Sequence, residues 1–148
     1  MTLENWLSIG KLKKHTTSKE EMEAIFGLIR RDLKDASLSG LSQDRKFNIT
    51  YNAAFQTALA LLFCYGYVPA SESHHYITWQ ALKEILPKDK SGLVNYFDGC
   101  RKKRNISNYD KAGTISEKET KELYEETKNF VIFIKKVIKD SFPEYFSP

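Results

Sequence analysis

Hydrophobic positions along the chain recur every three or four residues almost throughout, which is the period of an α-helix. No alternating pattern typical of a β-strand extends beyond a few residues. A short first segment covers roughly Leu3–Lys14. The next helix is expected to begin at Ser18, because Ser18 and Glu21 fit a capping box, and to end at Gly40.

A third helix is predicted from Ser42 to about Tyr65. Its apolar face is the widest in the chain, so we expect it to be the central and most buried helix. Pro69 lies in the turn that follows it. A fourth, shorter helix is expected to begin near Ser73 and to end at Pro87.

Two further helices complete the pattern. The fifth is predicted from about Gly92 to Tyr109. The last opens at a second capping box, formed by Ser116 and Glu119, and Pro143 closes it. Helices joined by short loops predict an all-α fold, namely an up-and-down four-helix bundle with one or two extra short helices.

Length and composition agree with one helical domain. The 148 residues suit a single domain, 1–148, whose core we place at about residues 18–141. An apolar content of 41% and an aromatic content of 13% are enough to form that core. The formal net charge of +4 is explained by a solvated surface without any partner, so the clustering of charges says more than their total.

Several classes of protein are disfavoured by residue spacing. Cys64 and Cys100 lack the spacing of a zinc site, and adjacent histidines such as His74 and His75 point about 100° apart on a helix. We therefore expect no metal and no cofactor. The N-terminus does not resemble a signal peptide, and the most apolar stretch, Ala53–Tyr67, is too short to cross a bilayer. The prediction is a cytoplasmic protein without a membrane partner.

The fifth predicted helix carries the clearest candidate site. A continuous basic run covers residues 101–104, and Arg101, Arg104, Asn105 and Asn108 share one helix face. Tyr109 lies one turn past Asn105. Arginine offers a planar fork to phosphate oxygens, and asparagine can bond a base or a sugar, so this face suits a nucleic acid or a nucleotide. The alternative is an ordinary solvated basic face.

The third predicted helix supplies a second polar set. Arg45, Asn48 and Asn52 lie along one side, with Tyr51 next to them in sequence. Asparagine is a poor helix former, so two in the middle of a helix indicate a partner. That partner is either a bound ligand or the fifth helix, in which case the asparagines would fix the register of the bundle.

Five segments of the sequence, taken in order, resemble a known family. They are DLKDA (Asp32–Ala36), RKFNITYNAAFQTALALL (Arg45–Leu62), GYVP (Gly66–Pro69), SHH (Ser73–His75) and RKKRNISNYD (Arg101–Asp110). Their order and spacing resemble the HEPN family (higher eukaryotes and prokaryotes nucleotide-binding), over roughly residues 24–137.

The resemblance implies a helical bundle that usually forms a homodimer, and many HEPN proteins are metal-independent ribonucleases. Their motif is an arginine, a polar residue and, a few positions later, a histidine. Arg104 and Asn105 match its start, but Tyr109 stands where the histidine would be, and no histidine follows His75. Unperturbed tyrosine, with a pKa of about 10, exchanges protons poorly near neutral pH. The acid–base half of the motif is therefore missing.

Three functional hypotheses follow from these residues. The first is a non-catalytic or weakly active protein, in a toxin–antitoxin or defence setting with a nucleotidyltransferase-type antitoxin as a possible partner. It would bind RNA or a nucleotide through Arg101, Arg104, Asn105, Asn108 and Tyr109, with Asn48 and Asn52 in support. The second is an active metal-independent endoribonuclease with Arg104, Asn105 and Tyr109 as catalytic residues. The third is a structural or adaptor dimer.

Overall fold

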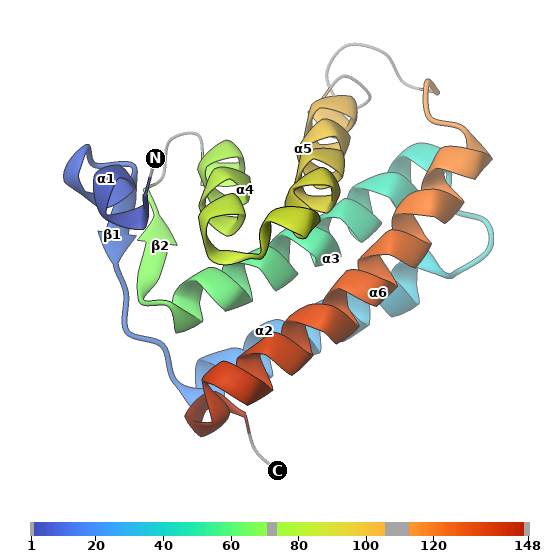
Figure 1. Ribbon diagram of the computed structural model, residues 1–148. Helices are drawn as coiled ribbons and strands as arrows, with labels where there is room; N and C mark the ends of the chain where they lie inside the picture. The colour runs from blue at the N-terminus through green and yellow to red at the C-terminus, as the bar shows by residue number, and fades with distance from the viewer. Residues whose placement is uncertain (1, 71–73, 106–112, 147–148) are drawn as a thin grey trace.

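The computed structural model describes residues 2–70, 74–105 and 113–146, and helices dominate it (Figure 1). The helices are α1 (Leu3–Ser8), α2 (Lys19–Ala36), α3 (Gln43–Cys64), α4 (His74–Ile85), α5 (Ser91–Asn105) and α6 (Glu117–Ser141), with short 3-10 turns at Lys88–Lys90 and Pro143–Tyr145. Two strands, β1 (Leu12–Lys14) and β2 (Tyr67–Pro69), complete the described elements. The predicted all-α class is confirmed.

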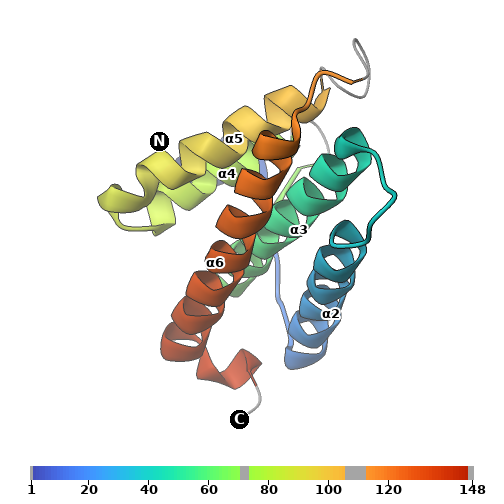
Figure 2. The ribbon, with the colours of Figure 1, turned by 90° about the vertical axis from the view of Figure 1, so that its right-hand side faces the viewer.

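The long helix α3 is the centre of the fold. It packs along α2 on one side and along α6 on another, while α4 and α5 lie side by side and cross it (Figures 1 and 2). Among the described helices α3 has the most buried residues, as its wide apolar face predicted. The finer assignment to an up-and-down four-helix bundle stays a prediction.

Hydrogen-bonded caps set where the helices begin. Ser42 Oγ accepts from the backbone N–H of Arg45 at the start of α3. At the start of α6, Ser116 and Glu119 each accept a backbone N–H from the other, which confirms the second predicted capping box. These caps satisfy N–H groups that have no partner within the helix.

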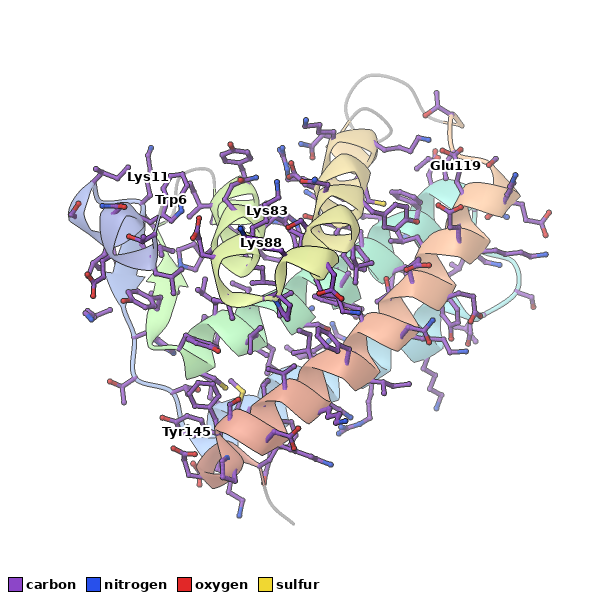
Figure 3. All side chains as sticks on the ribbon, viewed as in Figure 1. Trp6, Lys11, Lys83, Lys88, Glu119 and Tyr145 are labelled. Carbon is purple, nitrogen blue, oxygen red and sulfur yellow. The ribbon has the colours of Figure 1, made fainter. Side chains whose placement is uncertain are left out.

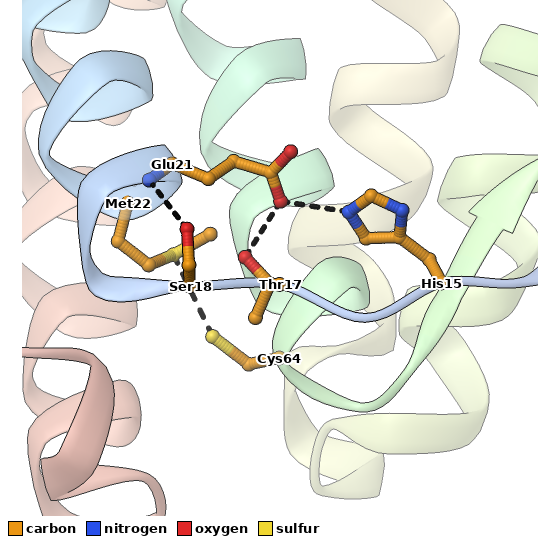
Figure 4. Close-up of polar contacts among 6 residues, drawn as sticks. All are labelled: His15, Thr17, Ser18, Glu21, Met22 and Cys64. Carbon is orange, nitrogen blue, oxygen red and sulfur yellow. Dashed lines mark hydrogen bonds and ion pairs between the residues drawn. The ribbon is translucent and has the colours of Figure 1, made fainter.

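The first predicted capping box forms only by half. Ser18 Oγ accepts from the backbone N–H of Glu21 at 3.1 Å, but the Glu21 carboxylate does not return the bond (Figure 4). Its Oε1 instead accepts from the Thr17 hydroxyl at 2.6 Å and lies 2.7 Å from His15 Nε2. Glu21 therefore fastens the segment between β1 and α2 to the start of α2.

A small antiparallel sheet replaces part of the predicted first helix. The helical prediction is wrong beyond Ser8, because Gly10 adopts a φ of +79° that ends the helix, and Leu12–Lys14 then pairs with Tyr67–Pro69. Gly66, at a φ of +92°, reverses the chain after α3 and directs the second strand to the first. Strands of three residues are too short for their alternation to be seen in the sequence.

Aromatic side chains attach α4 and α5 to the long helices. The Trp79 ring is fully buried and stacks on Phe97, with ring centroids 5.2 Å apart. Phe130 of α6 contacts both rings, and Tyr51 of α3 contacts Trp79. Side chains fill the space between the α4–α5 pair and the long helices (Figure 3). The pair is therefore held in a fixed position on α3.

None of the helices in the described part of the chain is long and apolar enough to cross a membrane.

Candidate anion-binding site between α4 and α5

A pocket of about 220 Å³ lies where the first turn of α4 meets the last turn of α5. The two helices are joined by the short turn at Lys88–Lys90 and run back along one another, so these two ends come together (Figure 1). The pocket is lined by His74, His75, Tyr76, Arg101, Arg104 and Asn105. Among the described residues, two arginines and no carboxylate line it, so it favours an anion.

Of the two pocket arginines, Arg104 has fewer described partners for its charge and its N–H groups. Its guanidinium carbon lies 5.2 Å from the centroid of the Tyr51 ring. Its Nε is buried and has no acceptor among the described residues. A buried N–H without a partner costs about 1–3 kcal/mol, and an acceptor on a ligand would remove that cost. A positive charge that is held against an aromatic face, without a carboxylate partner in the described part of the chain, suits a phosphate oxygen.

Arg101 is oriented by a carboxylate one turn earlier in α5. Its Nε donates to Asp98 Oδ1 at 2.7 Å, and both side chains are largely buried. The guanidinium carbon lies 5.7 Å from the centroid of the Tyr76 ring. Tyr76 is 42% exposed at the rim of the pocket. An exposed aromatic ring beside an arginine is the kind of surface on which a nucleobase stacks.

His75 is held by two aromatic residues of α3, Phe55 and Tyr51. Its ring stacks on Phe55 with centroids 3.8 Å apart and planes 10° from parallel. Its Nδ1 lies 3.0 Å from the Tyr51 hydroxyl, which also accepts a hydrogen bond of 3.0 Å from Trp79 Nε1. The imidazole is thus fixed to the core on one side and lines the pocket on the other.

Burial, together with electrostatic interactions with His74, Arg104 and Arg101, lowers the pKa of His75 to about 3. The ring is therefore uncharged at neutral pH. Burial likewise raises the pKa of Tyr51 well above its usual range, although the bond from Trp79 and the two arginines oppose that shift. The Tyr51 hydroxyl therefore keeps its proton.

The predicted site residues separate into three groups. Arg101, Arg104 and Asn105 come together in the pocket. Asn108 and Tyr109 lie outside the described residues.

The asparagines of α3 form the third group. Asn52 does not reach the pocket, because its amide donates to Asp32 Oδ2 on α2 at 2.8 Å. The alternative prediction, a bond across to α5, is also wrong for Asn52. Asn48 is half-buried on α3 and does not line the pocket either. The partner that two mid-helix asparagines indicated is, for Asn52, a buried carboxylate.

Residues that the sequence did not assign to the site are the histidines of α4, the Tyr76 ring and the Tyr51 hydroxyl. The adjacent His74 and His75 were the available signal, but the sequence does not show whether either of them reaches the site. In the described ranges, with 71–73 and 106–112 left aside, no group of three or more His, Cys, Asp or Glu side chains could hold a metal ion. The position of His74 and His75 beside the arginines depends on how α4 packs against α5, and the spacing of residues in the sequence does not reveal that packing.

No protein-family model, curated protein or solved structure matches the chain. The HEPN resemblance therefore stays a prediction, and the argument for function rests on the geometry of the pocket.

Proposed function

We propose that this protein binds RNA or a nucleotide through its phosphate in the pocket between α4 and α5, as a HEPN-type protein with an up-and-down bundle fold. One observation carries the proposal. Arg101 and Arg104 line the same pocket, and the buried Nε of Arg104 has no acceptor within the described chain. A phosphate oxygen supplies that acceptor and matches the charge.

The other pocket residues favour a nucleotide over a bare anion. The exposed ring of Tyr76 offers a face on which a base can stack, and the Asn105 amide can bond a base or a sugar. The net charge of +4 also attracts a polyanion at low salt. Phosphate contacts would supply affinity and the aromatic ring would supply preference for unstacked bases.

Binding is favoured over cleavage because the described pocket lacks a suitable acid–base pair. Cleavage of RNA without a metal needs one group to remove the 2′-hydroxyl proton and another to protonate the leaving oxygen. His75 has a pKa lowered to about 3, so it is a weak base, and its Nδ1 is engaged by Tyr51. We therefore propose a protein that is non-catalytic or weakly active.

A metal-independent endoribonuclease is the second candidate, and one observation favours it. His74 lines the pocket beside Arg101 and Arg104, which places an imidazole next to the proposed phosphate site. Histidine is the side chain best suited to proton transfer near neutral pH. In that mechanism Arg104 would stabilise the charge of the transition state.

One experiment distinguishes binding from cleavage. Labelled single-stranded RNA is incubated in EDTA with the wild type, with Arg104→Ala and with Arg45→Ala, a matched control on the exposed side of α3. We expect no cleavage, and binding that weakens with salt and is lost in Arg104→Ala but kept in Arg45→Ala. Cleavage by the wild type that Arg104→Ala lacks would establish the ribonuclease instead. Neither binding nor cleavage would favour the structural or adaptor dimer.

The proposal includes a homodimer and, as a partner, a nucleotidyltransferase-type antitoxin. Both rest on the HEPN resemblance. Sedimentation of the purified chain at several concentrations tests the dimer, and a small nucleotidyltransferase gene beside this one would support the second partner.

A further inference from the structure

We infer that His75 is a neutral hydrogen-bond donor to the bound phosphate, because Trp79 and Tyr51 hold its imidazole in the tautomer that carries the proton on Nε2. This inference rests on the proposed function and deepens it. It assigns a ligand contact to a residue outside the basic run of α5, and it names the ligand atom as an anionic oxygen.

The tautomer follows from an account of donors and acceptors. The indole Nε1 of Trp79 can only donate, and it donates to the Tyr51 hydroxyl oxygen. The hydroxyl of Tyr51 then has one proton left to donate, and His75 Nδ1 is the acceptor 3.0 Å away. If Nδ1 carried the proton instead, the Tyr51 hydroxyl proton would have no acceptor among the described residues, at the cost of an unpaired buried donor. The Tyr51 side chain is fully buried, so water does not remove that cost.

The second nitrogen of the ring is then a donor at the pocket. With Nδ1 turned toward Tyr51, Nε2 lies across the imidazole. Nε2 is not one of the buried polar atoms that lack a partner, and His75 lines the pocket. The stack on Phe55 keeps the ring from turning. Nε2–H is therefore exposed to whatever occupies the space beside Arg104.

The groups around His75 keep it neutral. His74 faces it from α4, Arg101 and Arg104 from α5, and the Tyr51 hydroxyl from α3. Burial and the positive charges lower the pKa of His75 to about 3. His75 Nε2–H lines the same pocket as the guanidinium groups of Arg101 and Arg104, and none of these three groups offers the ligand an acceptor. The three donors together therefore select an oxyanion that accepts several hydrogen bonds, such as a phosphate.

The tautomer is measured first, in the free protein. Long-range ¹H–¹⁵N correlation spectra of the histidine rings distinguish the two neutral tautomers from the imidazolium. We expect His75 to show the Nε2–H pattern from about pH 8 down to about pH 5, where an unperturbed histidine would be charged. In Tyr51→Phe, which keeps the ring and loses the hydroxyl, we expect a mixture of tautomers. An Nδ1–H tautomer or an imidazolium in the wild type would overturn the inference.

The donor role is measured next, with inorganic phosphate and with a short single-stranded RNA as probes. We expect the His75 Nε2 signal to shift on addition of either probe. His75→Phe keeps the stack on Phe55 and removes the donor, so we expect RNA affinity to fall roughly tenfold. His75→Gln, whose Nε2 amide can replace the imidazole donor, should retain more affinity than His75→Phe.

The outcomes separate the inference from the proposed function. If RNA binding depends on Arg104 but His75→Phe binds like the wild type, the donor role is overturned and the proposed function stands. If the wild type binds neither probe, the proposed function fails and the donor role fails with it, while the spectra of the free protein still decide the tautomer.

Discussion

The side-chain amide of Asn52 on α3 donates a hydrogen bond of 2.8 Å to the Oδ2 of Asp32 on α2. The same carboxylate oxygen accepts from Gln56 at 3.0 Å, and Arg31 donates to the other oxygen. Asp32 is buried, so these bonds replace the water that a carboxylate would otherwise bind. Asn52, which the sequence suggested as part of a ligand site, therefore connects two long helices.

Asp32→Ala should lower the free energy of unfolding by about 3 kcal/mol, because it leaves the Asn52 and Gln56 amides without an acceptor at a buried position. Urea denaturation followed by circular dichroism measures the change. Asp140→Ala, an exposed control on α6, should change it by less than about 0.5 kcal/mol. A small loss in Asp32→Ala would mean that water solvates the two amides.

The stability of the fold should fall as the pH drops from about 6.5 toward about 3, in part through His75. The folded protein holds the His75 ring neutral with a pKa of about 3, whereas the unfolded chain binds a proton near the ordinary value of 6.5. The unfolded state therefore binds more protons over this range, and stability rises with pH there. His75→Phe should reduce that slope in urea denaturation curves collected at several pH values. An unchanged slope would show that His75 takes up its proton in the folded state.

Glu21 should contribute a second loss of stability in acid. Burial alone would raise the pKa of its carboxyl, but the bonds from Thr17 and His15 and the charge of His15 lower it below 4.5. A carboxylate with a lowered pKa stabilises the fold above about pH 4.5, and this contribution is lost as the pH falls through the folded value.

Glu21→Gln should remove that acid-dependent component and should also loosen the segment between β1 and α2, which Glu21 fastens (Figure 4). Limited proteolysis near His15 measures the loosening. Glu20→Gln, exposed one residue earlier, serves as the control. Equal cleavage in both variants would show that the contacts of Glu21 do not hold this segment.

Tyr76→Ala should weaken binding of single-stranded RNA by roughly tenfold while leaving the binding of inorganic phosphate nearly unchanged. The exposed ring can stack on a base, which inorganic phosphate lacks. Tyr76→Phe keeps the ring and should bind RNA like the wild type. Calorimetric titration with both ligands measures the difference. An equal loss of affinity for RNA and for phosphate would mean that Tyr76 supports Arg101 and does not stack on a base.

Capping signals in the sequence predicted where α3 and α6 begin, whereas α2 ends at Ala36, earlier than the predicted Gly40. Ser42 begins α3 as its cap, and Ser116 with Glu119 begins α6, because a cap acts within one turn. The two strands were missed because each depends on a partner far away in the sequence: Leu12 pairs with Pro69. Their pairing follows from the reversal at Gly66 and from the packing of α3.

Of the two helices that line the candidate site, the sequence pointed to the residues of α5 but not to those of α4. Arg101, Arg104 and Asn105 share a helix face, and helical spacing alone is enough to group them. His75 belongs to α4, and its role depends on a hydrogen bond to Tyr51, 24 residues earlier on a different helix. Contacts between helices depend on how the helices cross, and periodicity does not determine that.

Both walls of the pocket belong to one pair of consecutive helices, α4 and α5, which Trp79 fastens to the rest of the molecule. A partial opening that released this pair would dismantle the pocket while α2, α3 and α6 remained packed. Such openings appear as amide hydrogen exchange at a free energy below that of global unfolding. A ligand that binds only the closed form slows exchange in α4 and α5 selectively. If a bound nucleotide protects only the amides of α4 and α5, this pair of helices is a separate cooperative unit within one small domain.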